Sequence, residues 1–307
     1  MAVRQYTIWE RFLAPIARLF IDEEELHQYA KSVDWERESQ RFARGDVITP
    51  EYYSSQNFHG IEGGYLNSAA AVSYDAITQY VTPPNENWVR QAVIDAIQVI
   101  QPRRIIDLGC GTGSTTLMLK ETFPEAEVVG LDLSPYMLVR ASHKAENMGL
   151  DISWRHGNAE QTGFPENSFD LVTATLLFHE TPPAISQIIL HESFRLLVPG
   201  GQALILDGNQ KNLRNLEWLN DLFEEPYIRD YGGGSVDAWM GAAKFGAVHT
   251  EDVWWVHQLT SGVKPISSED GKIQTQVLNN SPIFRGDTVD DNGSDGVTVP
   301  SPAYTQA

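Results

Sequence analysis

The sequence predicts an α/β fold built on a mainly parallel sheet of seven strands that closes with an antiparallel hairpin. Two observations support this prediction. From residue 88 onward, short apolar runs alternate with segments of helical periodicity, and two later apolar runs are separated only by the polar residues Thr250, Glu251 and Asp252. The alternation predicts parallel strands joined by right-handed crossovers. The expected strands are 103–108, 127–132, 152–157, 169–176 and 202–207, with the hairpin at 245–249 and 253–260.

Helices are expected between these strands because apolar residues recur there at helical spacing. Segment 183–197 shows how such a helix ends, since Pro199, Gly200 and Gly201 follow it directly and interrupt helical structure. The helices expected in this part of the chain are 88–100, 113–122, 135–148, 183–197 and 212–224.

An N-terminal helical lid is expected ahead of the sheet. Apolar residues at helical spacing over 4–20 predict an amphipathic helix that packs on the protein's own core, with contact to a membrane surface as the less favoured alternative. Residues 22–44 continue as a charged helix that ends at Gly45. Residues 51–87 mix aromatic, glycine and proline residues, which is typical of an ordered loop acting as a lid.

The composition divides the chain into three parts. We expect N-terminal helices and a lid segment over 1–87 and a ligand-binding α/β domain over 88–265. Beyond Pro265 the sequence is rich in Ser, Asp, Asn, Gly and Thr and has few large apolar side chains, so residues 266–307 are expected to form a disordered acidic and polar tail.

Charge and cysteine content argue against several classes of protein. The chain has 41 acidic and 22 basic side chains and a formal net charge of -19, which disfavours binding to nucleic acid. Cys110 is the only cysteine, so no intrachain disulfide can form and a cytoplasmic location is expected. We also expect no secretory signal and no membrane-spanning helix, because no apolar stretch is long enough.

A glycine-rich turn follows the first predicted strand. The residues DLGCGTG, 107–113, carry the strand from Asp107 through Gly109, Gly111 and Gly113 into a helix, so that backbone rather than side chain faces a ligand above the turn. A dinucleotide-binding fingerprint would place its third glycine where Ser114 stands.

An acidic residue ends the next predicted strand. Asp132 lies at the end of VVGLD, where a carboxylate can accept hydrogen bonds from both hydroxyls of a ribose. The strand, turn, helix and strand-terminal acid follow one another in the expected order, and together they predict a site for an adenosine-containing ligand.

These motifs resemble those of the class I S-adenosylmethionine-dependent methyltransferases, whose first motif reads as DLGCGTG does here. The similarity covers about residues 88–260, through LDLSPYML at 131–138, HGNAEQTGFPENSFDLV at 156–172, LLFHETP at 176–182 and LLVPGGQALILD at 196–207. The sequence is similar to the ubiquinone and menaquinone C-methyltransferase branch, also described as methyltransferase types 11 and 25. This resemblance implies a Rossmann-like fold, S-adenosyl-L-methionine as cofactor and a small-molecule acceptor.

The resemblance also assigns roles to individual residues. It implies that Asp107 and the turn glycines hold the methionine part of the cofactor, that Asp132 binds the ribose and that Leu133 flanks the adenine. Asn158 and Ala159 stand where the family usually has Asp and Ala, and their amide groups can still pair with adenine. The remaining residues are Thr175 or Leu176, whose backbone would face the methionine end, and Cys110, a small residue inside the turn and not a nucleophile.

Candidates for a general base lie at the substrate-facing edge of the predicted sheet. His179 is the first choice, next to Glu180 after the fourth strand, and the lid segment offers His59, Glu62 and Tyr65, with Tyr52 and Tyr53 as aromatic neighbours. Each could instead serve packing or loop capping. We expect no metal site. Four aromatic residues could roof the pocket or, equally simply, bury the predicted hairpin against a helix: Trp239, Trp254, Trp255 and Phe223, near the glycines 232–234. An apolar roof would fit a hydrophobic or aromatic acceptor.

Two other functions stay open from the sequence. A nicotinamide-dependent oxidoreductase would use a related fold, although Ser114 and the lack of a Tyr-x-x-x-Lys pair disfavour it. A protein that binds S-adenosylmethionine without catalysis would share every motif described above. The sequence does not identify the acceptor or the oligomeric state.

Overall fold

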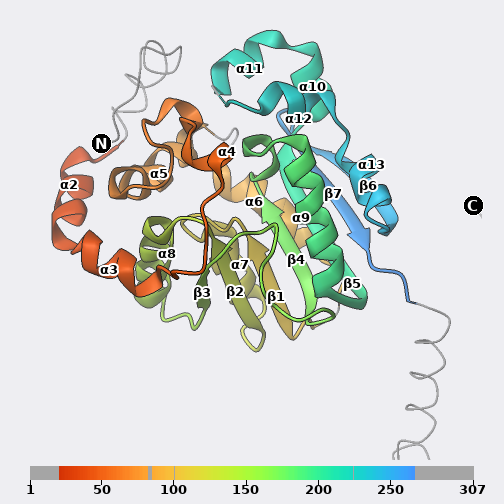
Figure 1. Ribbon diagram of the computed structural model, residues 1–307, viewed down its shortest axis with the longest axis horizontal. Coiled ribbons are helices and arrows are strands. Elements are labelled where there is room, and N and C mark those ends of the chain that lie inside the picture. Colours follow the sequence, from red (N-terminus) through yellow and green to blue (C-terminus); the bar gives the residue numbers. More distant parts are fainter. Residues whose placement is uncertain (1–20, 82–84, 100, 224, 267–307) are drawn as a thin grey trace, which may run out of the picture. The chain divides into compact units, whose positions relative to one another are not determined.

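The computed structural model describes residues 21–81, 85–99, 101–223 and 225–266. This part of the chain contains a seven-stranded sheet in the order β3-β2-β1-β4-β5-β7-β6 (Figure 1). Strands β1 to β5 pair with one another in parallel, and β7 is antiparallel to both β5 and β6. The predicted fold class is therefore confirmed. The strands are β1 (Arg104–Leu108), β2 (Glu127–Asp132), β3 (Ser153–His156), β4 (Phe169–Thr175), β5 (Leu197–Gly208), β6 (Gly246–Val253) and β7 (His257–Val263).

Helices cover both faces of the sheet (Figure 1). Neighbouring residues of a strand point to opposite faces, so Ile105 and Ile106 of β1 enter two separate apolar cores. Helices α6 (Glu86–Asp95) and α7 (Ser114–Thr122) cover the face of Ile105. Helices α9 (Pro183–Leu196) and α13 (Val236–Ala242) cover the face of Ile106. This layering holds the strand ends rigidly, which matters because the candidate site lies there.

The single helix predicted over 22–44 is in fact two helices, α2 (Glu23–Ser32) and α3 (Trp35–Phe42). The side chain of Asp22 caps α2 by accepting from the Glu25 N–H, and Asp34 caps α3 by accepting from the Arg37 N–H. Aspartate favours the cap position over the helix interior, so the chain breaks just before Asp34. Helix α3 packs against α8 (Pro135–Met148) and β3.

The lid segment contains more helix than the sequence predicted. It forms α4 (Glu51–Ser54), a 3₁₀ turn η2 (Phe58–Gly60) and the 14-residue helix α5 (Ser68–Val81). Helix α5 follows Asn67, whose side chain accepts from the Ala70 N–H, and its first turn is rich in alanine, the best helix former. The prediction of a loop is therefore wrong for 68–81, where helix propensity and the Asn67 cap outweigh the surrounding glycines and prolines.

The C-terminal part of the sheet also departs from prediction. Segment 212–224 forms two helices, α10 (Gln210–Asn215) and α11 (Glu217–Phe223), followed by α12 (Ile228–Gly233). The residues predicted to form the hairpin turn, Thr250–Asp252, belong instead to β6, and the chain reverses after Trp254, whose φ is +53°. Because β6 lies at the edge of the sheet with exposed positions along its length, it tolerates polar residues that a buried strand would not.

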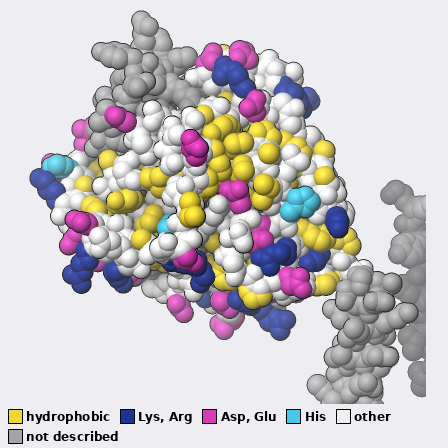
Figure 2. Space-filling model, in the orientation of Figure 1, with side chains coloured by type: hydrophobic (Ala, Val, Ile, Leu, Met, Phe, Trp, Pro, Cys, Tyr) yellow, Lys and Arg dark blue, Asp and Glu magenta, His cyan; other side chains and the backbone are white. Residues whose placement is uncertain are grey.

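Acidic and basic side chains are scattered over the face shown in Figure 2, and hydrophobic ones gather in its upper middle part. The scattered charges agree with a solvated acidic surface. Within the described residues, no helix has the length and apolarity needed to cross a membrane. The predicted amphipathic helix at 4–20 and nearly all of the predicted tail at 266–307 lie outside the described residues.

Candidate active site

A cavity opens at the carboxyl edge of the parallel strands, where open α/β sheets bind their ligands. It encloses about 760 Å³, including its open mouth. Its wall is made by the ends of β2 and β4, the glycine turn after β1 and residues of α4, α5 and α6. Most of the site residues predicted from the sequence line it, namely Tyr65, Gly109, Cys110, Gly111, Asp132, Leu133, Asn158, Ala159, Thr175 and Glu180.

The three glycines of the turn do different things. All have positive φ, +64° for Gly109, +54° for Gly111 and +80° for Gly113, a conformation that disfavours other residues. A Cβ on Gly113 would lie 2.5 Å from the ring of Trp154, and one on Gly109 would lie 2.7 Å from Leu177. None of the described residues lies within 4 Å of a Cβ on Gly111. Gly111 therefore keeps the cavity open, while the other two allow close packing.

Asp132 holds the turn in place at the tip of β2. Its Oδ2 accepts from the Gly111 N–H at 2.8 Å, and its Oδ1 accepts from the Ser134 N–H at 2.8 Å. Burial raises the pKa of Asp132 to about 6, against the opposing effect of these two hydrogen bonds. Burial makes the ionised form of Asp132 less stable, so hydrogen bonds from a ligand in the cavity would stabilise that form.

Asp107 lies beneath the turn and does not line the cavity. Its two oxygens accept from the Thr116 and Thr173 hydroxyls, each at 2.7 Å, which ties β1 to α7 and to β4. These bonds give Asp107 a role in ordering the turn, and the contact with the methionine part that the resemblance implies stays a prediction.

Three of the residues predicted to bind the cofactor differ in their hydrogen bonds and burial. The side chain of Asn158 pairs with Glu160, donating to its carboxylate and accepting from its N–H, each at 2.9 Å. Thr175, at the end of β4, has a buried hydroxyl with no hydrogen-bond partner among the described residues. Cys110 is buried, and burial raises the pKa of its thiol well above the usual value, which disfavours the reactive thiolate.

Sequence reasoning missed Arg90, which reaches the cavity from α6. Its guanidinium lies 2.6 Å from Glu86 and donates to the Thr115 hydroxyl at 2.7 Å, and both charged side chains are almost fully buried. The i, i+4 spacing of Glu86 and Arg90 indicates a helical ion pair but not which side of the helix faces a cavity. Only the packing of α6 against the sheet shows that Arg90 points inward.

His179 and Glu180 lie in the 3₁₀ turn η3 (Phe178–Glu180), just after β4. The chain leaves β4 with Leu176 at φ +57°, a strained conformation for leucine that turns η3 back over the strand ends. Asp207, at the end of β5, accepts from the Phe178 N–H at 2.7 Å and lies 2.6 Å from His179 Nδ1. A carboxylate can only accept, so Nδ1 carries the proton and Nε2 points toward Glu180.

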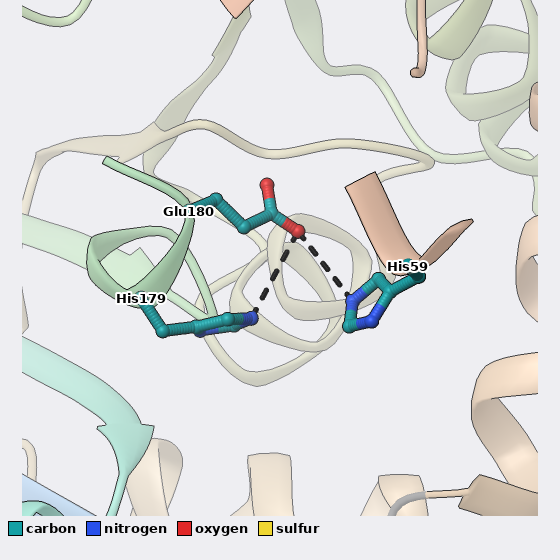
Figure 3. A group of neighbouring side chains, drawn as sticks. All are labelled: His59, His179 and Glu180. Atoms are coloured by element: carbon teal, nitrogen blue, oxygen red, sulfur yellow. Dashed lines mark ion pairs between the residues drawn. The ribbon is translucent and has the colours of Figure 1, made fainter. Parts of the chain in front are cut away.

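His59 meets this pair from η2 of the lid segment (Figure 3). Its Nε2 lies 3.7 Å from Glu180 Oε1, and His179 Nε2 lies 3.9 Å from the same oxygen. On its other side, Glu225 Oε1 lies 2.9 Å from His59 Nδ1 and accepts from the His59 N–H at 2.6 Å. His59 itself has φ +47°, which is uncommon for histidine. Two histidines, each fixed by a carboxylate, therefore flank one glutamate.

Tyr65 completes this group by donating its hydroxyl to Glu180 Oε1 at 2.9 Å. Tyr65 is buried and its ring stacks on Phe58, so the donor is held firmly. We call His59, His179 and Glu180, with their partners Tyr65, Asp207 and Glu225, the histidine–glutamate cluster. Glu180 and Tyr65 are its members that line the cavity.

Burial and neighbouring charges shift the pKa values of the three central residues of the cluster. Burial opposes a charge on His179, but the ion pair with Asp207 outweighs it and raises the pKa of His179 to about 10. Burial opposes a charge on His59 as well, and the neighbouring Glu225 raises its pKa on balance. Burial, with the negative charge of Glu225, raises the pKa of Glu180 to about 8. The imidazoles thus hold protons easily and Glu180 resists losing one.

Comparison with protein families identifies the segment that carries this site. Residues 105–201, from β1 to β5, match the family described as "Methyltransferase domain". This segment is therefore similar to a methyltransferase domain. The matched residues include the glycine turn, Asp132, His179 and Glu180, whereas His59, Arg90, Asp207 and Glu225 lie outside them.

Curated relatives and solved structures extend the comparison. The chain is 39% identical over 141 residues to the demethylmenaquinone methyltransferase of Thermus thermophilus, covering 46% of this chain and 63% of that protein. The enzyme of the same name from Deinococcus radiodurans is 33% identical, with 46% and 57% covered. The chain thus spans less than two thirds of either relative's length.

The fold is shared with the phosphoethanolamine N-methyltransferase 2 of Haemonchus contortus in complex with S-adenosylhomocysteine. The match has a TM-score of 0.52 and 16% identity and covers 65% of this chain and 58% of that chain. At this identity the likeness shows the fold alone.

Trp239, Trp254 and Trp255, three of the aromatic residues predicted to roof the pocket, do not line the cavity. Trp254 and Trp255 are half exposed. Trp254 stacks on Trp88, and the ring of Trp255 lies tilted against Trp218, while Trp239 packs against Tyr231 at the core. The side chain of Phe223 lies outside the described residues. The region after β5 reaches the site through Glu225 instead.

Among the lid residues, Tyr52 and Tyr53 line the cavity, whereas Glu62 is exposed and does not. The Tyr52 hydroxyl donates to Glu160 at 2.9 Å, and this bond fixes α4 against the segment that holds Asn158. The lid segment therefore supplies aromatic side chains to the cavity wall and one histidine to the histidine–glutamate cluster.

Proposed function

We propose that this protein transfers a methyl group from S-adenosyl-L-methionine to a small-molecule acceptor. One observation carries the proposal: the open turn at Gly111, the carboxylate of Asp132 and the carboxylate of Glu180 line a single cavity. The first two suit an adenosyl ligand, and the third suits a group that must lose a proton. The family match over 105–201 and the names of the curated relatives support the same reaction.

The cofactor half of the cavity uses the residues at the sheet edge. Asp132 would accept from the ribose hydroxyls, with Leu133 beside the adenine and Ala159 offering its N–H to the ring. The orphan hydroxyl of Thr175 would gain a partner at the methionine end. Arg90 adds a buried positive charge at the wall, which suits the carboxylate of the methionine part.

The chemical step is a displacement at a methyl carbon that is already electrophilic. The acceptor's lone pair forms a bond to that carbon, the carbon–sulfur bond breaks, and its electron pair stays on sulfur as S-adenosylhomocysteine leaves. A protonated acceptor must also give up its proton. The protein's main task is to hold the acceptor atom in line with the carbon–sulfur bond at about 3 to 3.5 Å.

Glu180 is the group placed to take the acceptor's proton. It lines the cavity, whereas His179 stands behind it and is held by Asp207. A carboxylate whose pKa is raised by burial is a stronger base than an ordinary one, which favours proton transfer near neutral pH. We therefore assign the direct role to Glu180 and positioning roles to His179 and Tyr65, which revises the preference for His179 drawn from sequence.

A hydrophobic or aromatic acceptor fits the wall of the cavity. Aromatic and aliphatic side chains make up much of it, including Tyr53, Tyr74, Met137, Leu177 and Ile189. The curated relatives are named for action on demethylmenaquinone, a name that agrees with an apolar aromatic acceptor.

Two measurements test the proposal. Calorimetric titration should show binding of S-adenosylhomocysteine and none of NAD, and selective binding of NAD would overturn it in favour of an oxidoreductase. Incubation with methyl-labelled cofactor and a cell extract, followed by mass identification of the product, should then reveal the acceptor. Tight cofactor binding without any labelled product would instead indicate a non-catalytic binder.

Variants test the assignment of Glu180. Glu180→Gln should leave binding of S-adenosylhomocysteine unchanged and lower turnover by about 100-fold or more. Glu192→Gln is the matched control, because Glu192 is an equally buried carboxylate that pairs with Thr162 and Arg195 and does not line the cavity. Equal turnover of the two variants would remove Glu180 from the mechanism.

A further inference from the structure

The histidine–glutamate cluster has a feature that the transfer reaction alone does not explain. Each of its three central side chains offers one ligand atom, and these atoms lie within 4.8 Å of one another. In Figure 3 the carboxylate of Glu180 points between the two imidazoles, with one oxygen directed at both rings. A methyl transfer needs one base, and nothing in that step requires two histidines aimed at the same point.

We propose that His59, His179 and Glu180 form a binding site for a divalent transition-metal ion. Two imidazole nitrogens and one carboxylate oxygen make a donor set that suits Zn²⁺, Fe²⁺, Mn²⁺ or Co²⁺ and leaves further coordination positions open. Ligands at 2.0 to 2.2 Å from an ion in tetrahedral geometry lie about 3.4 Å apart. The separations of 3.7 and 3.9 Å from Glu180 to the two imidazoles need to shorten by only a few tenths of an ångström.

The partners of the two histidines provide independent support. A metal-binding histidine almost always donates its other ring N–H to a carboxylate or carbonyl, which fixes the tautomer and the direction of the ring. Asp207 holds Nδ1 of His179 in this way, and Glu225 holds Nδ1 of His59. Both arrangements direct Nε2 toward Glu180. Such doubled support is expected of a metal site and is more than a single base requires.

The buried charges of the cluster also favour a cation. Glu180, Glu225 and Asp207 bring three carboxylates together, with side chains 10%, 0% and 1% exposed. One oxygen of Glu225 is buried with no hydrogen-bond partner in the described part of the chain. A divalent ion would replace the protons on the imidazole Nε2 atoms and on Glu180, and its charge would offset most of the charge of the three carboxylates.

The site is open enough to load an ion and close enough to the cavity to use it. The side chain of His59 is 30% exposed, which gives a route from solvent, and Glu180 belongs to the cavity wall. Given the proposed function, an ion here would bind an acceptor oxygen and lower the pKa of that hydroxyl. Glu180 would then act as a ligand in place of a base, so the hydroxyl proton would pass to solvent through the open mouth of the cavity, and the resulting alkoxide or phenoxide would attack the methyl carbon. The acceptor class then becomes a hydroxyl-bearing molecule, with a phenol or enol favoured.

Metal binding can be measured directly on the whole chain. After treatment with a chelator, the protein should take up one equivalent of Zn²⁺ or Co²⁺, by calorimetry and elemental analysis, and should bind Mg²⁺ at least about 100-fold more weakly. Bound Co²⁺ should show the visible absorption of a nitrogen- and oxygen-ligated ion. Absence of a stoichiometric Zn²⁺ or Co²⁺ site would overturn the proposal.

Variants locate the ion. His59→Gln and Glu180→Gln should each weaken Zn²⁺ binding by more than about 100-fold, and Asp207→Asn and Glu225→Gln by about 10- to 100-fold. His191→Gln, at an exposed histidine of α9, is the control and should bind Zn²⁺ as the original chain does. Equal Zn²⁺ binding by the His59, Glu180 and His191 variants would place any ion elsewhere and overturn the proposal.

A second measurement separates this proposal from the methyltransferase assignment. Every variant should be titrated with S-adenosylhomocysteine, which probes the far side of the cavity and the integrity of the fold. Loss of Zn²⁺ with retained cofactor binding supports the metal site. Cofactor binding without any Zn²⁺ uptake refutes the metal site alone, whereas Zn²⁺ uptake without cofactor binding refutes the proposed function alone.

Discussion

Replacing Asp132 with asparagine tests the cofactor site with little change in shape. In a ribose complex the carboxylate would accept two charge-assisted hydrogen bonds, each contributing about 1.5 to 3 kcal/mol. An asparagine keeps one acceptor oxygen and loses the charge, so we expect a loss of about 2 to 4 kcal/mol. Binding of S-adenosylhomocysteine should weaken roughly 30- to 1000-fold, measured by calorimetry at pH 7.5.

The same substitution should change stability far less than affinity. A pKa raised from 3.8 to about 6 means that the ionised, buried carboxylate destabilises the folded state by about 3 kcal/mol above pH 6. Asparagine removes that cost. Its amide NH₂ group, however, would face the N–H of either Gly111 or Ser134, both of which donate to Asp132, and the loss of that hydrogen bond costs about 1.5 to 3 kcal/mol. The two effects nearly cancel, so Tm should shift by only a few degrees.

The dependence on pH gives this prediction a second test. The folded state holds the Asp132 proton more tightly than the unfolded chain, so this residue stabilises the fold below pH 4 and loses that contribution as pH rises through about 6. Cofactor binding needs the ionised form and should be about tenfold weaker at pH 5 than at its plateau above pH 7. Both trends should vanish in Asp132→Asn, which isolates them from other titrating groups.

Asp170 provides the control for this substitution. Its Oδ2 accepts from the N–H groups of Arg103 and Arg104 at 2.8 and 2.9 Å, so it too is an aspartate that caps backbone donors, but at the opposite edge of the sheet. Asp170→Asn should bind S-adenosylhomocysteine as the original chain does. If Asp132→Asn also bound it with unchanged affinity, or kept the same pH dependence, the assignment of the ribose site would be wrong.

Three further predictions concern other parts of the cavity. Gly113→Ala should lower the free energy of unfolding by roughly 2 to 5 kcal/mol, because its Cβ would meet Trp154 and its backbone is left-handed, whereas Gly111→Ala should chiefly weaken cofactor binding. Chemical unfolding and calorimetry of both variants measure these effects, and equal behaviour of the two would contradict their assigned roles. Tyr65→Phe should keep cofactor affinity but lower turnover, since Glu180 loses a hydrogen bond, and an unchanged kcat would show that this bond is only structural. Arg90→Met should cost about 3 to 5 kcal/mol in urea unfolding by leaving the buried Glu86 unpaired, and adding Glu86→Leu should restore most of it.

The meeting of the glycine turn and Asp132 in one cavity could be predicted because local sequence determines it. The end of a parallel strand, a glycine turn and the next strand's final acid must come together at one edge of the sheet, whatever else the chain does. The rule that places Asp132 also applies to Asp207, which ends β5 in the same way. Asp207 therefore carried a readable signal, because it follows an apolar run and ends a parallel strand.

The acceptor half could not be predicted because it depends on contacts between distant segments. His59 and Glu225 lie 166 residues apart, on either side of the matched domain, and meet only when the lid segment and the region after α11 fold over the strand ends. No periodicity specifies that meeting. Trp254 and Trp255 illustrate the same limit. Aromatic composition alone predicts a pocket wall and surface packing equally well, and in the structure both tryptophans are half exposed while other residues build the wall.

This division within the cavity bears on how substrate choice arises in the molecule. Asp132 and the turn belong to the sheet, so they stay fixed when outer segments change, whereas His59, Glu225 and the wall tyrosines come from segments that the sheet does not require. Glu180 lies at the boundary, since it follows β4 closely in the chain while its carboxylate contacts Tyr65 and His59 of the lid segment and its neighbour His179. Changing the lid segment should therefore alter the acceptor, and any bound ion, without altering the cofactor. Transfer of residues 51–67 from a relative with a known acceptor would test that independence, and a simultaneous loss of cofactor affinity would contradict it.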